Sequence, residues 1–340
     1  MQLDPWSEST RSPGVGLRPF AGDVITDLEM AEWVPCPSTS LPGCLKTLHL
    51  IDGSRRLDAR VIVWSDEKPY YGGLGTCSVG HVSMDLCSRS AHIAQVVNHR
   101  YLVVGGAVSG TSVAIDPPRG GTGELVYTFY ADPKSRNERE TPIVLLQSLM
   151  LRQEQQSVDR LALRLDDVAR GFFEFDTLVL QDGRVEMGSS GSLVLGYIKA
   201  LETDYLGLSE RAVLGRLQVG ERTPIFYFQY GGDTKGRFSW YVRLLPESVL
   251  FTQGSGLVRL EMLAPDGFDT LPDVVKQIAD FSPLLLGRLA SSLYKDPRAP
   301  QNLIPTGALE RELKRRMGDP QLISRRIRRW VMEQSQVRSV

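Results

Sequence analysis

Three acidic residues occur in an order that suits hydrolysis of a phosphodiester. Asp52 follows the apolar segment Leu48–Ile51, Glu154 lies in a long helical pattern, and Asp182 follows the apolar segment 177–181. Divalent ions such as Mg²⁺ and Mn²⁺ prefer oxygen ligands. Two such ions about 3.5–4 Å apart activate a water and stabilise the leaving oxygen. The order strand–Asp, helix–Glu, strand–Asp therefore predicts a metal site.

Each of these residues also has an ordinary structural explanation. Asp-Gly is a common turn dipeptide, which accounts for Asp52 and Asp182 at strand ends without any chemistry. Glu154 alone would be a solvated helix residue, and Asp167 in the same helical pattern is an alternative third carboxylate. The joint order, rather than any single residue, favours the metal site.

The segments that must position these residues predict an α/β fold. Residues 143–169 have apolar side chains at helical spacing, and 72–91 are glycine-rich and predict a loop or a small insertion. Expected strands are 48–54, 58–64, 101–104, 125–130, 177–181, 193–199, 225–230, 238–244 and 257–262. The last three are expected to be antiparallel neighbours. The C-terminal part predicts helices with a break at 297–305.

Composition divides the chain into three expected parts. Residues 1–45 are rich in Pro, Gly and Ser and predict an extended N-terminal arm. Residues 46–265 are expected to form the core with inserted strands. Residues 266–340 are expected to form a helical, basic segment that packs on the core or on a dimer partner.

Charge is unevenly distributed along the chain. The net charge is −1, but residues 288–329 have 11 Lys and Arg against 4 Asp and Glu. The body is therefore acidic and the C-terminal segment is basic, which suits contact with a polyanion or a partner surface. A solvated charged helix face explains the segment equally well.

Several classes of protein are disfavoured by the sequence. Zinc held by Cys77, His81 and Cys87 is a weak possibility, because no Cys pair has C-x-x-C spacing. No apolar run approaches the length of a membrane span, and the first residues lack the basic and apolar regions of a secretory signal. We therefore expect a cytoplasmic protein without a membrane partner.

The order of the three acids resembles that of ribonuclease-H-like nucleases, in which the first and fourth strands are adjacent and a helix packs across them. The resemblance extends, from about residue 48 to 325, to the NurA nucleases, which process DNA ends with the HerA translocase. Segments that resemble NurA motifs are Leu50–Arg55, Met150–Glu154, Leu178–Gly183, Leu195–Lys199, Gly220–Phe226, Ser239–Leu244 and Pro297–Leu303.

The resemblance implies roles for particular residues. It implies a ribonuclease-H-like mixed sheet core with extra antiparallel strands and a helical C-terminal region. Asp52, Glu154 and Asp182 would be catalytic metal ligands for Mn²⁺ or Mg²⁺, with two ions expected. Lys199 would contact the scissile phosphate. The expected DNA contacts are Arg55, Lys199, Arg222, Tyr241 and Arg298.

The sequence also departs from the family. Many NurA proteins have a histidine in a late C-terminal motif, whereas this chain has none after His99. Asp280 is a weak candidate to replace it as a metal ligand. The interval from Glu154 to Asp182 is longer than expected, which keeps Asp167 as an alternative to Glu154.

These expectations predict a metal-dependent deoxyribonuclease. It would act as a 5′–3′ exonuclease and a single-strand endonuclease in double-strand-break repair, as a homodimer with a HerA-type translocase, near the nucleoid. The alternative is a scaffold that binds DNA or the translocase without cleaving. A ribonuclease or a strand-transfer enzyme is a weaker alternative, because we find no appended sequence-recognition module.

We predict that Asp52→Ala and Asp182→Ala each abolish cleavage, because each would remove a metal ligand. Both variants should remain folded and still bind DNA. The measurement is cleavage of end-labelled DNA with Mn²⁺, Mg²⁺ or EDTA, with circular dichroism to check folding. Near-normal activity of either variant would show that the site is elsewhere.

Overall fold

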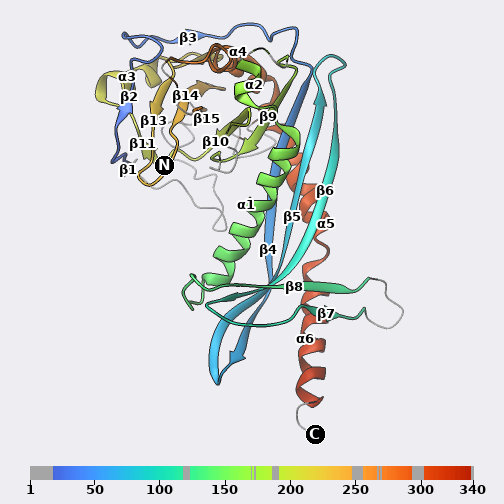
Figure 1. Cartoon of the computed structure of the whole chain (residues 1–340). Coiled ribbons are helices and arrows are strands. Elements are labelled where there is room, and N and C mark those ends of the chain that lie inside the picture. Colours follow the sequence, from blue (N-terminus) through green and yellow to red (C-terminus); the bar gives the residue numbers. More distant parts are fainter. Residues whose placement is uncertain are drawn as a thin grey trace, which may run out of the picture. The chain divides into compact units, whose positions relative to one another are not determined.

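The computed structural model (Figure 1) describes residues 18–117, 123–169, 171, 174–185, 191–246, 256–265, 268, 270–292 and 302–337. The chain forms two compact units that interleave along the sequence. Unit 1 comprises residues 1–51, 82–92 and 157–308, and unit 2 comprises 52–81, 93–156 and 309–340. Five elements continue from one unit into the other. They are β4 (Thr47–Ser65), β5 (Lys68–Asp85), β6 (Ser90–Gly105), α1 (Thr141–Leu161) and α5 (Ile304–Arg316).

Unit 1 is built on strands that follow the order β2-β13-β14-β15-β10-β9-β4. The strands of this unit are β1 (Arg18–Pro19), β2 (Val24–Ile25), β3 (Cys36–Pro37), β9 (Thr177–Asp182), β10 (Val194–Ile198), β11 (Thr203–Asp204), β12 (Glu221–Arg222), β13 (Phe226–Phe228), β14 (Arg237–Arg243) and β15 (Leu257–Leu263). Its helices are α2 (Leu165–Ala169), α3 (Leu208–Arg216) and α4 (Asp273–Leu289). Strands β13, β14 and β15 are antiparallel neighbours, as expected.

The parallel strands are in the interior of unit 1. Strand β9 pairs in parallel with β4 on one side and with β10 on the other. Leu178, Val179 and Leu180 of β9 are at most 3% exposed, and all five residues of β10 are buried. Continuous apolar runs of this kind are typical of parallel strands that are covered on both faces.

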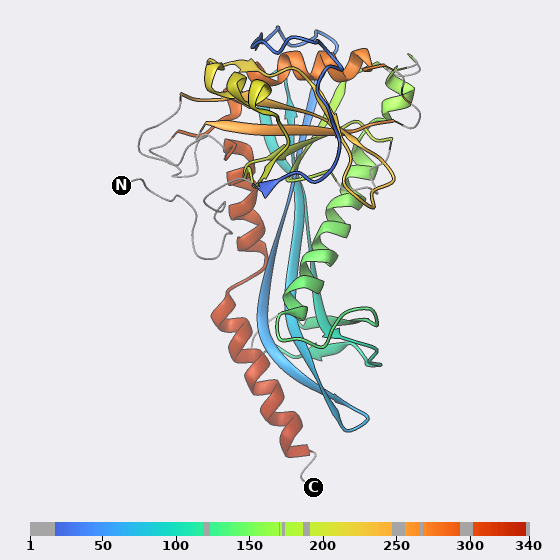
Figure 2. The same ribbon diagram turned by 90° about the vertical axis from the view of Figure 1, so that its left-hand side faces the viewer.

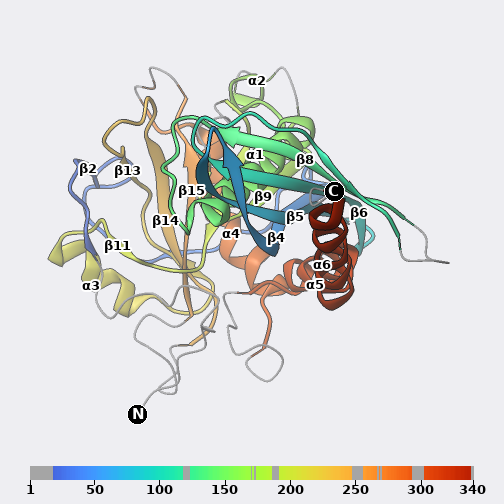
Figure 3. The ribbon, with the colours of Figure 1, turned by 90° about the horizontal axis from the view of Figure 1, so that it is seen from below.

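The described part of the expected N-terminal arm packs on unit 1. Strand β2 lies beside β13 (Figure 3), and β3 pairs with β12. The segment then passes over helix α4, where the backbone N–H of Thr39 donates to the carbonyl of Asp280 at 2.9 Å (Figures 1 and 2). Trp33 is 8% exposed and packs with Phe226 in an aromatic cluster. The segment is thus extended, and it contributes to the core.

Unit 2 has helices on both faces of its strands (Figure 2). Its strand order is β4-β5-β6-β8-β7, with β7 (Val113–Ile115) and β8 (Leu125–Asp132). Helix α1 packs on one face through Leu145, Leu146 and Leu149. Helix α6 (Pro320–Val337) packs on the other through Ile323 and Ile327. We call these the α1 face and the C-terminal face.

The strand order confirms the expected mixed α/β core. The order is β6-β5-β4-β9-β10. Strands β4, β5 and β6 follow one another in the chain, and on the other side of β4, β9 pairs with it in parallel and β10 pairs in parallel with β9. This is the ribonuclease-H-like order. The antiparallel strands β15, β14 and β13 extend it, and the C-terminal region is helical. None of the helices in the described ranges is long and apolar enough to cross a membrane.

Three sequence-based expectations about elements were wrong. Strand β4 continues through Asp52-Gly53, where we expected the first strand to end in a turn. Residues 72–91, expected to be a loop, belong mainly to the long strand β5. The helix expected at 143–169 ends at Leu161, and α2 begins only at Leu165.

Close packing explains the glycines of β5. A Cβ on Gly75 would lie 2.3 Å from Leu146 Cδ1 of α1, and one on Gly73 would lie 3.0 Å from Pro142 Cβ. A Cβ on Gly80 would lie 2.5 Å from the backbone oxygen of Gln95 in β6. These glycines let a helix and a neighbouring strand approach closely, rather than marking a loop.

We predict that Gly80→Ala destabilises the protein by about 1–3 kcal/mol, because the new methyl group would force the backbone of β6 to move. Gly43→Ala is the control, since a Cβ there would meet no atom within 4 Å. Urea unfolding measures both. Equal stability of the two variants would contradict the close approach of β5 to β6.

Candidate metal centre and its surroundings

The register of β4 and β9 places two aspartates at neighbouring positions. The strands pair in parallel from Thr47↔Thr177 to Ile51↔Gln181. Asp52 and Asp182 are the next residue of each strand. Paired residues of neighbouring strands point to the same face and lie about 5 Å apart. The expected adjacency of the two strands is confirmed, and the pleat directs both aspartates away from the face of Ile51 and Gln181.

In unit 1, Asp182 forms an ion pair with Lys199. The Lys199 Nζ lies 2.5 Å from Asp182 Oδ2, and the two side chains are 12% and 24% exposed. The same Nζ donates to Asn302 Oδ1 at 3.3 Å. Lys199 directly follows β10, so the strand delivers its ammonium group to the end of β9. Asn302 is 2% exposed and holds Lys199 from the C-terminal part of unit 1.

Tyr197 is a buried polar residue beside Asp182 that we did not single out from the sequence. It pairs with Asp182 across β9 and β10, so both side chains point to the same face. Its hydroxyl is buried and has no hydrogen-bond partner among the described residues. Burial and, secondarily, the negative charge of Asp182 raise the pKa of Tyr197 well above its usual value. Tyr197 lies in an apolar strand segment, so nothing in the sequence indicates that its hydroxyl is buried beside a carboxylate.

In unit 2, Asp52 lies close to a carboxylate that the sequence did not identify. Asp52 is 9% exposed, and its Oδ1 accepts a hydrogen bond from the backbone N–H of Gly53 at 2.9 Å. Carboxylate oxygens of Asp52 and Glu310 lie within 4.8 Å of each other. Glu310 is on α5, in the basic C-terminal segment. Most charged residues there are Arg or Lys, so nothing in the sequence marked Glu310 as a candidate ligand.

Glu154, the predicted third carboxylate, lies on the other face of β4. A Cβ on Gly53 would be 2.2 Å from Glu154 Oε1 and 2.9 Å from Met150 Cγ of α1. Gly53 therefore faces α1. Because successive strand residues point to opposite faces, Asp52 faces away from α1. Glu154 thus reaches β4 from α1 beside Gly53, and its role as the third ligand stays a prediction.

The alternative acids have other partners. Asp167 of α2 lies 3.9 Å from Arg164 Nε in an exposed ion pair. Asp280 of α4 accepts from Arg222, with 3.1 Å between Arg222 Nε and Asp280 Oδ1. Asp280 is thus part of a structural ion pair, and this corrects its weak assignment as a metal ligand.

Two of the expected DNA contacts are in the interior. Arg222 is 1% exposed, and Tyr241 is 3% exposed within the aromatic cluster of unit 1. Neither can reach a phosphate without unfolding its surroundings, so both expectations are corrected. Arg55 is exposed and donates to Gln147 Oε1 at 2.6 Å. Arg298 lies outside the described residues.

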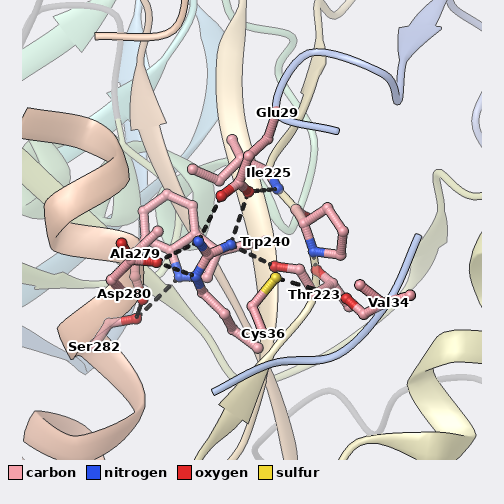
Figure 4. A network of polar contacts seen from close by, with 11 residues as sticks. Glu29, Val34, Cys36, Thr223, Ile225, Trp240, Ala279, Asp280 and Ser282 are labelled. Carbon is pink, nitrogen blue, oxygen red and sulfur yellow. Dashed lines mark hydrogen bonds and ion pairs between the residues drawn. The ribbon is translucent and has the colours of Figure 1, made fainter. Parts of the chain in front are cut away.

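Arg222 joins three segments of unit 1 through Glu29 and Asp280, both of which are labelled in Figure 4. Its guanidinium binds Glu29 in a bidentate pair at 2.7 and 2.8 Å and also contacts Asp280. Glu29 Oε2 accepts a further hydrogen bond from the backbone N–H of Ile225 at 2.8 Å. The network therefore ties the N-terminal segment and α4 to β12. Such a bidentate, charge-assisted pair fixes geometry as well as energy.

The electrostatics of this network are set by burial and by Arg222. Burial alone would raise the pKa of Glu29, but the hydrogen bonds and charge of Arg222 outweigh it and hold the pKa below its usual value. Burial alone would lower the pKa of Arg222, but Glu29 and Asp280 raise it. Burial also raises the pKa of the nearby Cys36 thiol.

We predict that Glu29→Gln costs about 3–5 kcal/mol of unfolding free energy at pH 7, because it leaves Arg222 partly unpaired in the interior. A carboxyl with a lowered pKa in the folded state stabilises above its unfolded pKa of about 4.3 and loses this effect as pH falls. The difference between wild type and Glu29→Gln should therefore shrink below about pH 4.3. Urea unfolding from pH 3.5 to 7 measures it.

The control for this prediction is Glu32→Gln, because Glu32 is exposed on the same N-terminal segment. It should change stability by less than about 0.5 kcal/mol at every pH. A difference between wild type and Glu29→Gln that does not vary with pH would contradict the assigned ion pair.

Comparisons with known proteins bear on the family. Residues 177–305 match the family model of the NurA domain. The chain is also similar to a solved structure, the NurA nuclease from Sulfolobus solfataricus, at 10% identity and a TM-score of 0.36, over 86% of this chain and 90% of that one. No curated protein is matched by the sequence. The matched segment includes β9, with Asp182, and Lys199 and Asn302, and this part of the chain is similar to the NurA domain.

Proposed function

We propose that the protein is a metal-dependent deoxyribonuclease. The observation that supports this most is the ion pair of Lys199 with Asp182 at the end of β9, whose parallel partner β4 continues directly into Asp52. Paired carboxylates with an adjacent ammonium group provide both negative charge for cations and a positive contact for a phosphate. The NurA domain supports the same class of activity.

The donor set fits a hard divalent ion. Carboxylate oxygens are suitable ligands for both Mn²⁺ and Mg²⁺, so Asp52 and Asp182 would hold either metal. We propose that two ions bind. The buried hydroxyl of Tyr197 beside Asp182 adds a polar atom to that face. When bound, such ions supply a hydroxide nucleophile and stabilise charge on the phosphate.

The protein's own residues would orient the substrate. Lys199 would move from Asp182 to a phosphate oxygen when DNA is bound, and Asn302 would keep its ammonium group near the strand end. The interaction of Lys199 with a developing oxyanion would strengthen as negative charge builds up. The hydrogen bond from the Gly53 N–H would keep one carboxylate oxygen of Asp52 directed toward the backbone of β4.

Exposed cations of the C-terminal helices would bind the DNA backbone. Arg311, Lys314, Arg325, Arg328 and Arg329 are exposed on α5 and α6. Contacts of this kind release counterions and carry no sequence preference. We propose a 5′–3′ exonuclease with single-strand endonuclease activity that acts at DNA ends near the nucleoid, as a homodimer with a HerA-type translocase.

One observation favours a second candidate. Lys199 already neutralises Asp182, and an ion pair at 2.5 Å competes with a cation for the same carboxylate. A scaffold that binds DNA or the translocase, without cleaving, would keep this pair permanently. The two candidates differ in whether the protein cleaves DNA when a divalent ion is supplied.

We predict that the wild-type protein cleaves DNA with Mn²⁺ or Mg²⁺ and not with EDTA, and that Lys199→Gln lowers the rate by about 10²–10³-fold, as loss of an oxyanion donor does. Duplexes and single strands labelled at the 5′ or the 3′ end measure both rate and polarity. DNA affinity, measured by fluorescence anisotropy, should change by only a few-fold.

Lys134→Gln is the matched control, since Lys134 is exposed and lies elsewhere in the chain. Release of label from the 5′ end as the first product would support the proposed polarity. DNA binding without cleavage under every ion, even with the translocase added, would favour the scaffold.

A further inference from the structure

We infer that Glu310 binds the divalent ion together with Asp52 in unit 2, in the role we expected of Glu154. The inference rests on the proposed metal-dependent function and concerns only which residues of unit 2 bind the ion with Asp52. Carboxylate oxygens of Asp52 and Glu310 lie within 4.8 Å of each other. One cation can contact both oxygens at the 2.0–2.6 Å distances typical of Mg²⁺ and Ca²⁺ ligands.

Helix α5 has a fixed position on unit 2. Leu309, the residue before Glu310, is fully buried, and its Cδ1 would lie 3.2 Å from a Cβ on Gly80 of β5. Leu313 and Met317 of the same face are at most 2% exposed. With this face of α5 fixed, Glu310 points about 100° away from Leu309, and its carboxylate lies within 4.8 Å of that of Asp52 in β4.

The end of α5 is held by donors from β4 and β6. Arg56 Nη1 donates to the carbonyl of Gly318 at 2.8 Å, and Arg100 Nη2 donates to that of Met317 at 3.2 Å. Asn98 Nδ2 donates to the carbonyl of Arg316 at 2.6 Å. Cationic and amide donors at a helix C-terminus satisfy carbonyls that have no partner within the helix.

The spacing along the two elements agrees with this anchoring. Arg56 lies four residues after Asp52 on the same face of β4, which is about 13 Å along a strand. Met317 lies seven residues after Glu310, which is about 10 Å along a helix. Since Arg56 meets the helix at Met317 and Gly318, the same alignment carries Glu310 to the level of Asp52.

The chemistry of this pair suits a divalent cation. Asp52 is buried and Glu310 is half-buried, and packing keeps their carboxylate oxygens close together. A divalent ion can bind both carboxylates at once. Glu154 lies beside Gly53 on the α1 face, whereas Glu310 comes within 4.8 Å of Asp52 from the C-terminal helix.

The test is direct measurement of Mn²⁺ binding to the full-length protein by electron paramagnetic resonance of the free ion. We expect Glu310→Gln to weaken binding at least 10-fold, as loss of a ligand charge does, and Asp52→Asn to weaken it as well. The controls are Glu312→Gln, two residues away on the same helix and paired with Arg315 and Arg316, and Glu154→Gln. Both controls should bind Mn²⁺ with wild-type affinity.

Thermal unfolding supplies a readout that does not depend on activity. The gain in melting temperature from EDTA to saturating Mn²⁺ should be larger for wild type than for Glu310→Gln, since ligands stabilise the state that binds them. A purely structural role for Glu310 would instead lower the melting temperature by the same amount with and without the ion.

The outcomes separate this inference from the proposed function. Loss of binding in Asp52→Asn with wild-type affinity in Glu310→Gln would overturn the role of Glu310 and leave the metal site intact. Weakened binding in Glu154→Gln in place of Glu310→Gln would return the third ligand to α1. Absence of Mn²⁺ binding by the wild-type protein would overturn the proposed function itself.

Discussion

The site depends on the parallel pairing of β4 with β9 in one register. Because side chains alternate along a strand, pairing Ile51 with Gln181 sends Asp52 and Asp182 to one face and the apolar neighbours to the other. A slip of one residue in either strand would turn its aspartate to the opposite face and separate the pair. The buried Leu178, Val179 and Leu180 resist such a slip, since the α1 side and the opposite side of β9 are both covered.

The glycines of β5 and β4 determine which face is available for chemistry. Gly53, Gly73 and Gly75 have no side chain, so α1 approaches the strands closely and fills its face with Leu145, Leu146 and Leu149. Glu154 is carried to this face with the helix. The face opposite α1 receives the residues of the C-terminal part, Asn302 beside Lys199 in unit 1 and Glu310 beside Asp52 in unit 2.

Many charged residues of unit 1 serve its interior. Glu261 is fully buried and pairs with Arg259 at 2.8 Å and with Arg237 at 3.4 Å, while Arg222 pairs with Glu29. A basic residue within a family-like segment is therefore no guide to a DNA contact. The segments around Arg222 and Tyr241 resemble NurA motifs, and here they build the core that supports the strands.

The sequence by itself located several strands and predicted the two aspartates as metal ligands. Strong apolar runs located β8, β9, β10, β14 and β15, and Asp182 ends β9 where Gly183 adopts a positive φ of 92°. The sequence could not determine which face of the sheet each later helix covers. The apolar spacing of a helix shows which of its sides is buried, but not the surface on which that side packs. Tertiary packing decided that Glu154 lies beside Gly53, that Arg222 is internal, and that Glu310 lies beside Asp52. The glycine-rich segment of β5 was predicted to be a loop for the same reason. Its glycines allow the close approach of α1 and β6, which only the packed structure shows.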